Sequence, residues 1–236
     1  MNPIFLQALS LHDIYDNNDE CIHAAADIAA ELGIAGIDIE DRLLATYEPD
    51  YLQELAHQIE GKGVQFGYCG LIVPFNEPVS SIPDEINRVK TLIDALPHLG
   101  IDSVRVPGNG VVDGQTLEFT FDAVRTKLQT ICDYAADANI TVFLHNHNHG
   151  STPSTGKQVL RMLDEIDSPD ISYVLDTGQF QGSPGAGGFG PMENAAHPAR
   201  RYQIPVAGAN HTLFAIARDP VDRGVRHGVY PREMSS

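Results

Sequence analysis

The sequence predicts an α/β fold: a (β/α)8 barrel in which the last one or two β/α units are degenerate or missing. Three observations lead to this prediction. Short segments with the composition of β-strands alternate strictly with segments of helical periodicity through about residue 180. Each pair of segments occupies roughly 30 to 37 residues, as a βαβ unit requires. Polar residues also follow the ends of several different predicted strands.

Six short apolar segments are the predicted strands. Because strands that alternate with helices pair in parallel, we expect them to form one parallel sheet. In chain order they are IFLQALS (4–10), IAGIDIE (34–40), VQFGYCGLIV (64–73), IDSVRVP (101–107), ITVFLHN (140–146) and ISYVLDT (171–177).

Between the strands, apolar residues recur at spacings of three and four, which predicts amphipathic helices. The first helix, 19–32, stops at Gly33, a residue typical of helix C-termini. The helix that begins near Pro83 carries this proline in its first turn, where the missing N–H costs nothing. The remaining helices are expected at 50–61, 116–138 and 154–166.

An open doubly wound sheet is the competing architecture, and the positions of polar residues separate the two. In a barrel, functional residues gather at the C-terminal ends of several strands. An open sheet concentrates them at one switch point. Here the second predicted strand ends with Asp38, Glu40 and Asp41, the fifth with histidines. The sixth ends near Asp176 and Gln179. This spread favours the barrel.

The C-terminal quarter of the chain departs from the pattern. It opens with the glycine-rich stretch SPGAGGFGP and shows no clear helical periodicity afterwards. Residues 181–236 hold six arginines, no lysine and four acidic residues, a net charge of +2, whereas residues 1–180 hold nine basic and 28 acidic residues, a net charge of −19. We therefore divide the chain into 1–182, with β/α units 1–6, and 183–236, an atypical C-terminal segment that is diverged or encoded out of frame.

Charge and composition exclude several classes of function. A formal net charge of −17 repels phosphate backbones, so we expect a small-molecule ligand and no nucleic-acid partner. No apolar run reaches the roughly 20 residues of a membrane helix, so no membrane partner is expected. Cys21, Cys69 and Cys132 lie far apart, which suits reduced thiols in the cytoplasm. The open edges of an incomplete barrel predict weak stability, aggregation or rescue by self-association as a homo-oligomer.

The stretch FLHNHNHG (143–150) carries three histidines at alternate positions. On a strand, His145, His147 and His149 point to one face. The first and third stand roughly 13 Å apart at about 3.3 Å per residue, too far to share one ion. A neighbouring pair can chelate one metal through imidazole nitrogens. The alternative is a polar strand end whose histidines serve only as hydrogen-bonding groups.

The segment YVLDTGQ (173–179) delivers Asp176 from an apolar strand into a Thr-Gly turn, which makes this carboxylate the leading functional candidate. Its alternative role is to cap a following helix, but the next residues, QFQGSPGAGG, are poor helix formers. GAGGFG (185–190) has the form of a dinucleotide-binding motif. It lies nine residues past Asp176 and runs into Pro191 instead of opening a helix, so we expect no nucleotide site.

Three of these segments, GIAGIDIE, ITVFLHNHNHG and ISYVLDTGQ, resemble motifs of the xylose isomerase-like TIM barrels. This family contains sugar and sugar-phosphate isomerases and epimerases and is related to the type-2 AP endonucleases. The resemblance covers about residues 1–182, with the motifs in the family's order. It implies a divalent metal ion (Mn, Mg, Co or Zn) bound by a glutamate of strand five, an aspartate of strand six, a histidine of strand seven and a glutamate of strand eight.

Carried over residue by residue, the resemblance implies a metal site at His145, Asp176 and His211. Asp176 matches the strand-six aspartate. His145 stands in place of the strand-five glutamate, and the resemblance implies that it is also the catalytic residue. His211, ahead of the apolar run LFAIA, is the candidate strand-seven histidine. No residue after Asp176 matches the strand-eight glutamate.

Three further positions are expected to bind substrate on the same resemblance. His147 matches the histidine of the family's strand-five motif. Gln179 replaces the histidine of the family's D-T-G-H, and Asp38 stands where strand two usually has glutamate.

Two functions are consistent with these features. The first is a metal-dependent sugar or sugar-phosphate isomerase or epimerase that transfers a proton next to a carbonyl, with activity impaired to the extent that the C-terminal segment lacks the family's ligands. The second is a barrel-derived protein that binds a sugar or a partner without catalysis. The phosphodiesterase chemistry of the AP endonucleases is disfavoured by the acidic charge.

Overall fold

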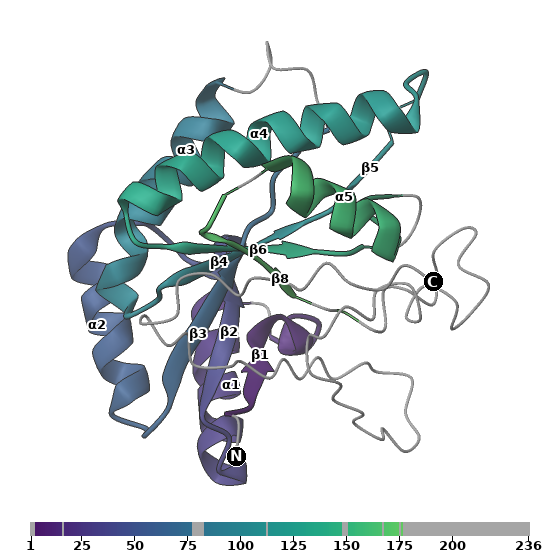
Figure 1. Ribbon diagram of the computed structural model, residues 1–236. Helices are drawn as coiled ribbons and strands as arrows, with labels where there is room; N and C mark the ends of the chain where they lie inside the picture. The colour runs from purple at the N-terminus through teal and green to yellow at the C-terminus, as the bar shows by residue number, and fades with distance from the viewer. Residues whose placement is uncertain are drawn as a thin grey trace, which may run out of the picture.

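The computed structural model describes residues 3–15, 17–76, 83–111, 113–147, 151–166, 168–174 and 176. Within this part of the chain, six parallel strands form one sheet in the order β1-β2-β3-β4-β6-β8. Neighbours in the sheet are therefore also consecutive among its strands, and the helices cover one face (Figure 1). A doubly wound sheet reverses its strand order and carries helices on both faces. The predicted (β/α)8 barrel is thus confirmed over the open sheet.

Each predicted strand and helix is found at its expected place. The strands are β1 (Phe5–Gln7), β2 (Gly36–Glu40), β3 (Gln65–Gly70), β4 (Ser103–Pro107), β6 (Thr141–His145) and β8 (Ile171–Val174). The helices are α1 (Asn18–Leu32), α2 (Pro49–Glu60), α3 (Pro83–Ala95), α4 (Leu117–Asp137) and α5 (Gly156–Ile166). Short 3-10 helices follow β1, β2 and α3, at Ala8–Leu11, Asp41–Leu43 and Leu96–Leu99. The first strand is therefore shorter than the predicted segment 4–10, which turns into a 3-10 helix after Gln7.

Local sequence explains the helix ends. The side chain of Asn17 accepts a hydrogen bond from the backbone N–H of Asp19 at 2.8 Å, and Thr116 caps α4 by accepting from Phe119. Gly33 ends α1 in the left-handed conformation, with φ of 66°, as its position predicted. These caps satisfy backbone groups that the helix itself leaves without partners.

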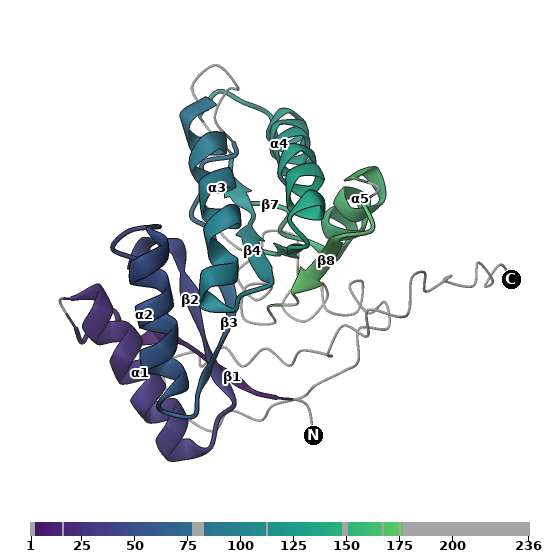
Figure 2. The same ribbon diagram turned by 90° about the vertical axis from the view of Figure 1, so that its left-hand side faces the viewer.

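The two faces of the sheet differ in chemistry. Side chains that face the helices form the apolar core, among them Ile37 and Ile39 of β2, Val104 of β4 and Leu144 of β6. Residues at the alternate positions point to the inner face of the curved sheet, on the side away from helices such as α2 and α3, which lie in front of the strands in Figure 2. Many of these are polar and still buried: Gln7, Asp38, Glu40, Arg105 and His145. Buried polar groups need partners, and the inner face supplies them to one another.

A β-bulge interrupts the alternation in β3. Its register with β2 shifts between Ile37 and Ile39, where β3 has one residue more than β2. Gly67 lies at the bulge, and a Cβ there would stand 1.9 Å from Oδ1 of Asp38. The same oxygen accepts a hydrogen bond from the backbone N–H of Tyr68 at 2.8 Å. The bulge therefore gives the Asp38 carboxylate a place on the inner face and turns Tyr68 toward it.

A second, two-stranded sheet was not predicted. Strands β5 (Asn109–Gly110) and β7 (Ser151–Thr152) pair antiparallel and join the segments that follow β4 and β6. Asn76, after β3, adds a third segment: its backbone N–H donates to Asn109, and its side-chain amide donates to the Gly110 carbonyl at 2.7 Å. Three connections at the C-terminal ends of the strands are thus held together.

Several predictions concern residues outside the described part of the chain. These are Gln179, His211, His149 and the proposed C-terminal segment 183–236. Among the helices that the structure does describe, none combines the length and the apolar character needed to cross a bilayer.

Candidate functional site

His145 and Asp176 meet at the C-terminal end of the sheet. His145 is the last residue of β6 and pairs with Val174 of the neighbouring strand β8, so Asp176 follows two residues later. Its Oδ2 lies 3.0 Å from Nε2 of His145. Both side chains are buried, at 5% and 8% exposure. Two of the three residues chosen from the sequence as metal ligands, His145 and Asp176, are therefore adjacent.

Asn146 fixes the position of Asp176. Its side-chain oxygen accepts from the Asp176 backbone N–H at 3.0 Å, and its amide nitrogen donates to the Asp176 carbonyl at 2.8 Å. The hydroxyl of Tyr173 donates to the same side-chain oxygen at 2.6 Å. Asn146 is fully buried, so these hydrogen bonds are shielded from water. They hold the carboxylate against the imidazole.

Arg105 of β4 contacts the other ring nitrogen of His145. Its Nη1 lies 3.2 Å from Nδ1. A guanidinium can only donate, so Nδ1 is the acceptor and the ring proton resides on Nε2, from which it is donated to Asp176. The pKa of His145 is lowered from 6.5 to about 4, mainly by burial and also by the charge of Arg105, while the hydrogen bond with Asp176 opposes the shift. His145 is neutral at pH 7.

Glu40, at the end of β2, anchors Arg105. Its Oε1 accepts from Nη2 of Arg105 at 2.8 Å, and its Oε2 lies 2.8 Å from Nε of Arg42. Glu40 and Arg105 are 4% and 7% exposed, whereas the Arg42 side chain is half-exposed. Arg42, Glu40, Arg105, His145 and Asp176 thus form one continuous series, which we call the charge row. Glu40 and Arg105 offset part of each other's desolvation cost as an ion pair, and Asp176 is stabilised by its hydrogen bond with the neutral ring of His145.

A glycine makes room for the charge row. A Cβ at Gly70, the last residue of β3, would lie 2.5 Å from Nη2 of Arg105 and 3.1 Å from its Nε. The guanidinium therefore lies over the end of β3, where only glycine leaves space. The ring of Tyr68 lies 5.8 Å from the guanidinium carbon.

Sequence reasoning named neither Glu40 nor Arg105 as a site residue. The available signal was the alternation of side chains along each strand. Glu40 and Arg105 each stand on a strand at a position that faces inward, between residues of the apolar core. A charged residue at such a position needs a buried partner of opposite sign. Which strand supplies that partner depends on sheet order, which the sequence alone left open.

Asp38 lies deeper in the barrel than Glu40 on the same face of β2. It is 1% exposed and bonds the backbone of Tyr68. The Tyr68 hydroxyl accepts from the side-chain amide of Gln7 at 3.3 Å, and burial raises the pKa of this tyrosine. The substrate-binding role of Asp38 stays a prediction.

His147 lies at the rim. Its ring is 6.1 Å from the ring of His145 and meets it edge-on. Its Nδ1 lies 3.4 Å from Oγ of Ser151, and its backbone N–H donates to the carbonyl of Pro153. Of the two histidines, His145 thus faces Asp176, and His147 stands above it, half-buried. This arrangement suits the substrate contact predicted for His147.

The His145–Asp176 pair fits a divalent ion as two of its ligands. Donor atoms that share one ion at about 2.1 Å lie about 3.0 to 3.4 Å apart, and Nε2 and Oδ2 are 3.0 Å apart. A neutral imidazole that ligates through Nε2 carries its proton on Nδ1, where Arg105 now donates. Within the described residues, no three His, Cys, Asp or Glu side chains form a metal-binding group, and the predicted third ligand, His211, lies beyond them.

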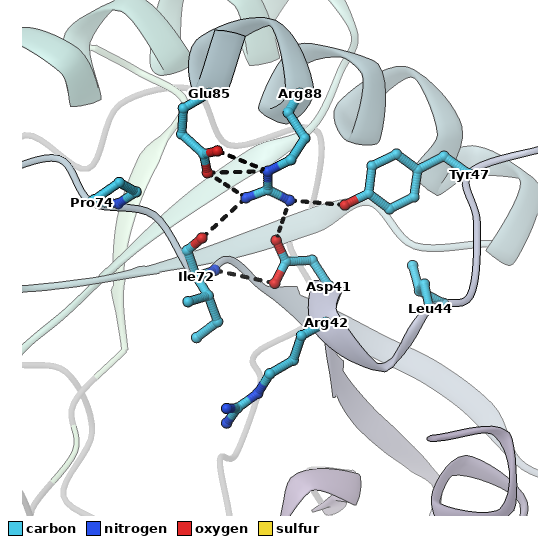
Figure 3. A pocket seen from close by; sticks show the side chains of 8 residues that line it. All are labelled: Asp41, Arg42, Leu44, Tyr47, Ile72, Pro74, Glu85 and Arg88. Carbon is cyan, nitrogen blue, oxygen red and sulfur yellow. Dashed lines mark hydrogen bonds and ion pairs between the residues drawn. The ribbon is translucent and has the colours of Figure 1, made fainter. Parts of the chain in front are cut away.

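A cavity of about 440 Å³ lies beside the charge row, between the segments that follow β2 and β3 (Figure 3). At its wall, Arg88 of α3 donates to Glu85, to Asp41 at 2.6 Å, to the Tyr47 hydroxyl at 2.8 Å and to the Ile72 carbonyl at 3.0 Å. The guanidinium thus makes its hydrogen bonds within the protein, and these bonds connect α3 to the segments that follow β2 and β3. The lining consists of Asp41, Arg42, Leu44, Tyr47, Ile72, Pro74, Glu85 and Arg88.

Comparison with known proteins agrees with the motifs. The family model of the xylose isomerase-like TIM barrels matches residues 26–225, and no curated protein matches the sequence. Among solved structures, D-psicose 3-epimerase from Clostridium cellulolyticum H10 superposes with a TM-score of 0.62 at 14% identity, over 73% of this chain and 63% of that one. L-ribulose 3-epimerase gives 0.59 at 17% identity, over 75% and 61%. 3-keto-D-glucoside 4-epimerase from E. coli gives 0.54 at 17%, over 67% and 63%.

These likenesses show the fold, and the chain spans less than two-thirds of the length of each of these three proteins. The family resemblance inferred from the three motifs is confirmed by the family match.

Proposed function

The chain belongs to the xylose isomerase-like TIM barrel family, and on that premise we propose that it is a sugar isomerase or epimerase. The proposed reaction moves a proton at the carbon next to the carbonyl of a small sugar or sugar phosphate. Family members with known structures that resemble this chain include a psicose, a ribulose and a 3-keto-glucoside epimerase. Their substrates share a ketone flanked by hydroxyl-bearing carbons, which is the chemistry that such proton transfer requires.

One observation carries the proposal: His145 Nε2 and Asp176 Oδ2 lie 3.0 Å apart at the C-terminal ends of neighbouring barrel strands. This is the end of the barrel at which the active sites of such folds are found. A buried imidazole beside a buried carboxylate can hold a cation and orient the oxygens of a sugar. Asn146 hydrogen-bonds the backbone of Asp176, and Arg105 hydrogen-bonds the ring of His145, so both groups are fixed in position.

In this proposal, His145 and Asp176 hold a divalent ion, and His211 is the third ligand. A bound divalent ion would polarise the sugar carbonyl and make the neighbouring C–H more acidic. His145 is neutral at pH 7 and could accept a proton at a ring nitrogen with a free lone pair, which is the catalytic role proposed for it. A ring bound to the ion through Nε2 has no such lone pair, so the two proposed roles of His145 exclude each other at any one moment. His147, Gln179 and Asp38 are proposed to orient the hydroxyl groups of the substrate.

The test is solvent isotope exchange. The full chain, supplied with Mn²⁺, is incubated in D2O with a panel of ketoses and their phosphates, and NMR follows deuterium at the carbon next to the carbonyl. We expect exchange with at least one ketose and its loss in Asp176→Asn. The matched control is Asp133→Asn, which alters an exposed aspartate on α4 that bonds Gln129.

Two results would contradict the proposal in different ways. Saturable binding of a ketose without exchange would assign the chain to the second hypothesis, a barrel that binds sugar without catalysis. Exchange that persists in Asp176→Asn would remove the His145–Asp176 pair from the reaction.

A further inference from the structure

We propose that Arg105 competes with a divalent cation for the His145–Asp176 pair, so that an ion binds only when the guanidinium leaves Nδ1. This inference rests on the proposed function, because it concerns the same pair of ligands. It adds a residue that sets how tightly the ion is held.

The direction of the hydrogen bonds is the first argument. Arg105 donates to Nδ1 of His145 at 3.2 Å, which places the single ring proton of the neutral imidazole on Nε2, facing Asp176. The nitrogen that faces the carboxylate therefore has no lone pair to offer. For Nε2 to ligate, the proton has to pass to Nδ1, and Nδ1–H and the guanidinium would then be two donors facing each other.

The charge of Arg105 is the second argument. The guanidinium is 7% exposed, so little water screens it from an ion bound at the neighbouring ring. Two cations on opposite sides of one imidazole repel each other more strongly in such a site than they do at a surface. The same guanidinium therefore weakens the binding of a cation to His145 in two ways: through its charge and through the position that it imposes on the ring proton.

The third argument is that Arg105 has an alternative hydrogen-bonding position available. Its Nε is buried and donates no hydrogen bond within the described residues. Oε2 of Glu40 is likewise buried and accepts none there, although Nε of Arg42 lies 2.8 Å away as an ion pair. Arg105 already bonds Oε1 of Glu40. A guanidinium released from His145 can thus pair with both oxygens of Glu40, the geometry that arginine and carboxylate prefer.

The chain offers a matched control in Arg42. Both arginines pair with the Glu40 carboxylate at 2.8 Å, but only Arg105 contacts His145. Arg105→Met and Arg42→Met therefore remove the same charge from the same partner and differ in what they do to the imidazole. A double variant, Glu40→Gln with Arg105→Met, removes one charge of each sign and keeps the net charge of the site.

The experiment measures Mn²⁺ affinity by calorimetry on the full chain and its variants, each first shown to fold by circular dichroism. We expect Arg105→Met, alone and with Glu40→Gln, to bind Mn²⁺ at least tenfold more tightly than the wild type, a difference of about 1.4 kcal/mol. Arg42→Met should stay within threefold of the wild type. Equal affinities in the wild type and Arg105→Met would overturn the inference and leave the proposed function standing.

A second measurement does not depend on the ion. In metal-free protein labelled with ¹⁵N-histidine, NMR distinguishes the two ring tautomers. We expect His145 to carry its proton on Nε2 in the wild type and, because Asp176 still accepts this proton, to keep it there in Arg105→Met, where the Nδ1 resonance shifts because its donor is lost. A proton on Nδ1 in the wild type would overturn the inference. If no variant and no wild-type protein binds Mn²⁺, both the inference and the ion of the proposed function are lost.

Discussion

The stability of the metal-free protein should fall between pH 6.5 and 4 because of one residue, His145. Burial lowers its pKa from 6.5 in the unfolded chain to about 4 in the folded protein. Above pH 6.5 the ring is neutral in both states, and the full stability is present. As the pH falls below 6.5, the His145 ring is protonated in the unfolded chain but stays neutral in the folded protein. Unfolding therefore becomes more favourable until the folded ring is protonated as well.

The magnitude follows from the two pKa values. A pKa that is lower by about 2.5 in the folded state corresponds to about 3 kcal/mol of unfolding free energy, at about 1.36 kcal/mol for each pKa unit. Carboxylates titrate over the same range, so the effect is isolated by comparison with His145→Gln, whose amide does not titrate but can still donate to Asp176.

The assay is urea unfolding at several pH values in the presence of a chelator. Circular dichroism is the suitable signal, because the chain has no tryptophan. We expect the free energy of unfolding of the wild type, relative to that of His145→Gln, to drop by about 3 kcal/mol from pH 7 to pH 4. A difference that stays constant over this range would refute the reasoning, because it would show that His145 is protonated equally in both states.

Three further outcomes are expected from the same structure. Gly70→Ala should lower the unfolding free energy by at least about 1 kcal/mol in urea unfolding, because its Cβ would lie 2.5 Å from Arg105; an unchanged midpoint would contradict the placement of the guanidinium. Arg88→Met should cost about 3 kcal/mol, because it leaves the buried carboxylate of Asp41 without its cation. The exposed pair of Arg161 is the control: Arg161→Met should change the melting temperature little, and an equal loss in both variants would refute the distinction.

The order of strands and helices could be predicted because the segments have clear periodicity. Short apolar segments of β-strand composition marked the six strands, and spacings of three and four marked the five helices. The small sheet β5–β7 was missed because each of its strands has only two residues, too few for any periodicity. Its pairing depends on segments about 40 residues apart that come together only once the barrel has formed.

Two of the five residues of the charge row could be found from sequence. His145 and Asp176 stand at strand ends next to glycine-containing turns, where polar residues indicate function. Glu40 and Arg105 were missed as partners because their contact crosses β3, and Gly70 gives no sign in the sequence that a guanidinium lies over it. The tautomer of His145 depends on its contacts with Arg105 and Asp176, so it could not be predicted from the motif that contains the histidine.

The extra residue in β3 has a consequence for how the chain tolerates deletions. Because of it, Cys69 packs toward the helices and Gly70 lies beneath Arg105, although an unbroken strand would reverse the two. Loss of either Gly67 or Tyr68 would remove the bulge but leave Cys69 opposite Ile39 and Gly70 opposite Glu40, so the space under the guanidinium would be kept. Loss of Cys69, after the bulge, would instead place Leu71 opposite Glu40, where Gly70 now leaves room for Arg105. The position of a missing codon within β3 thus decides whether the charge row survives.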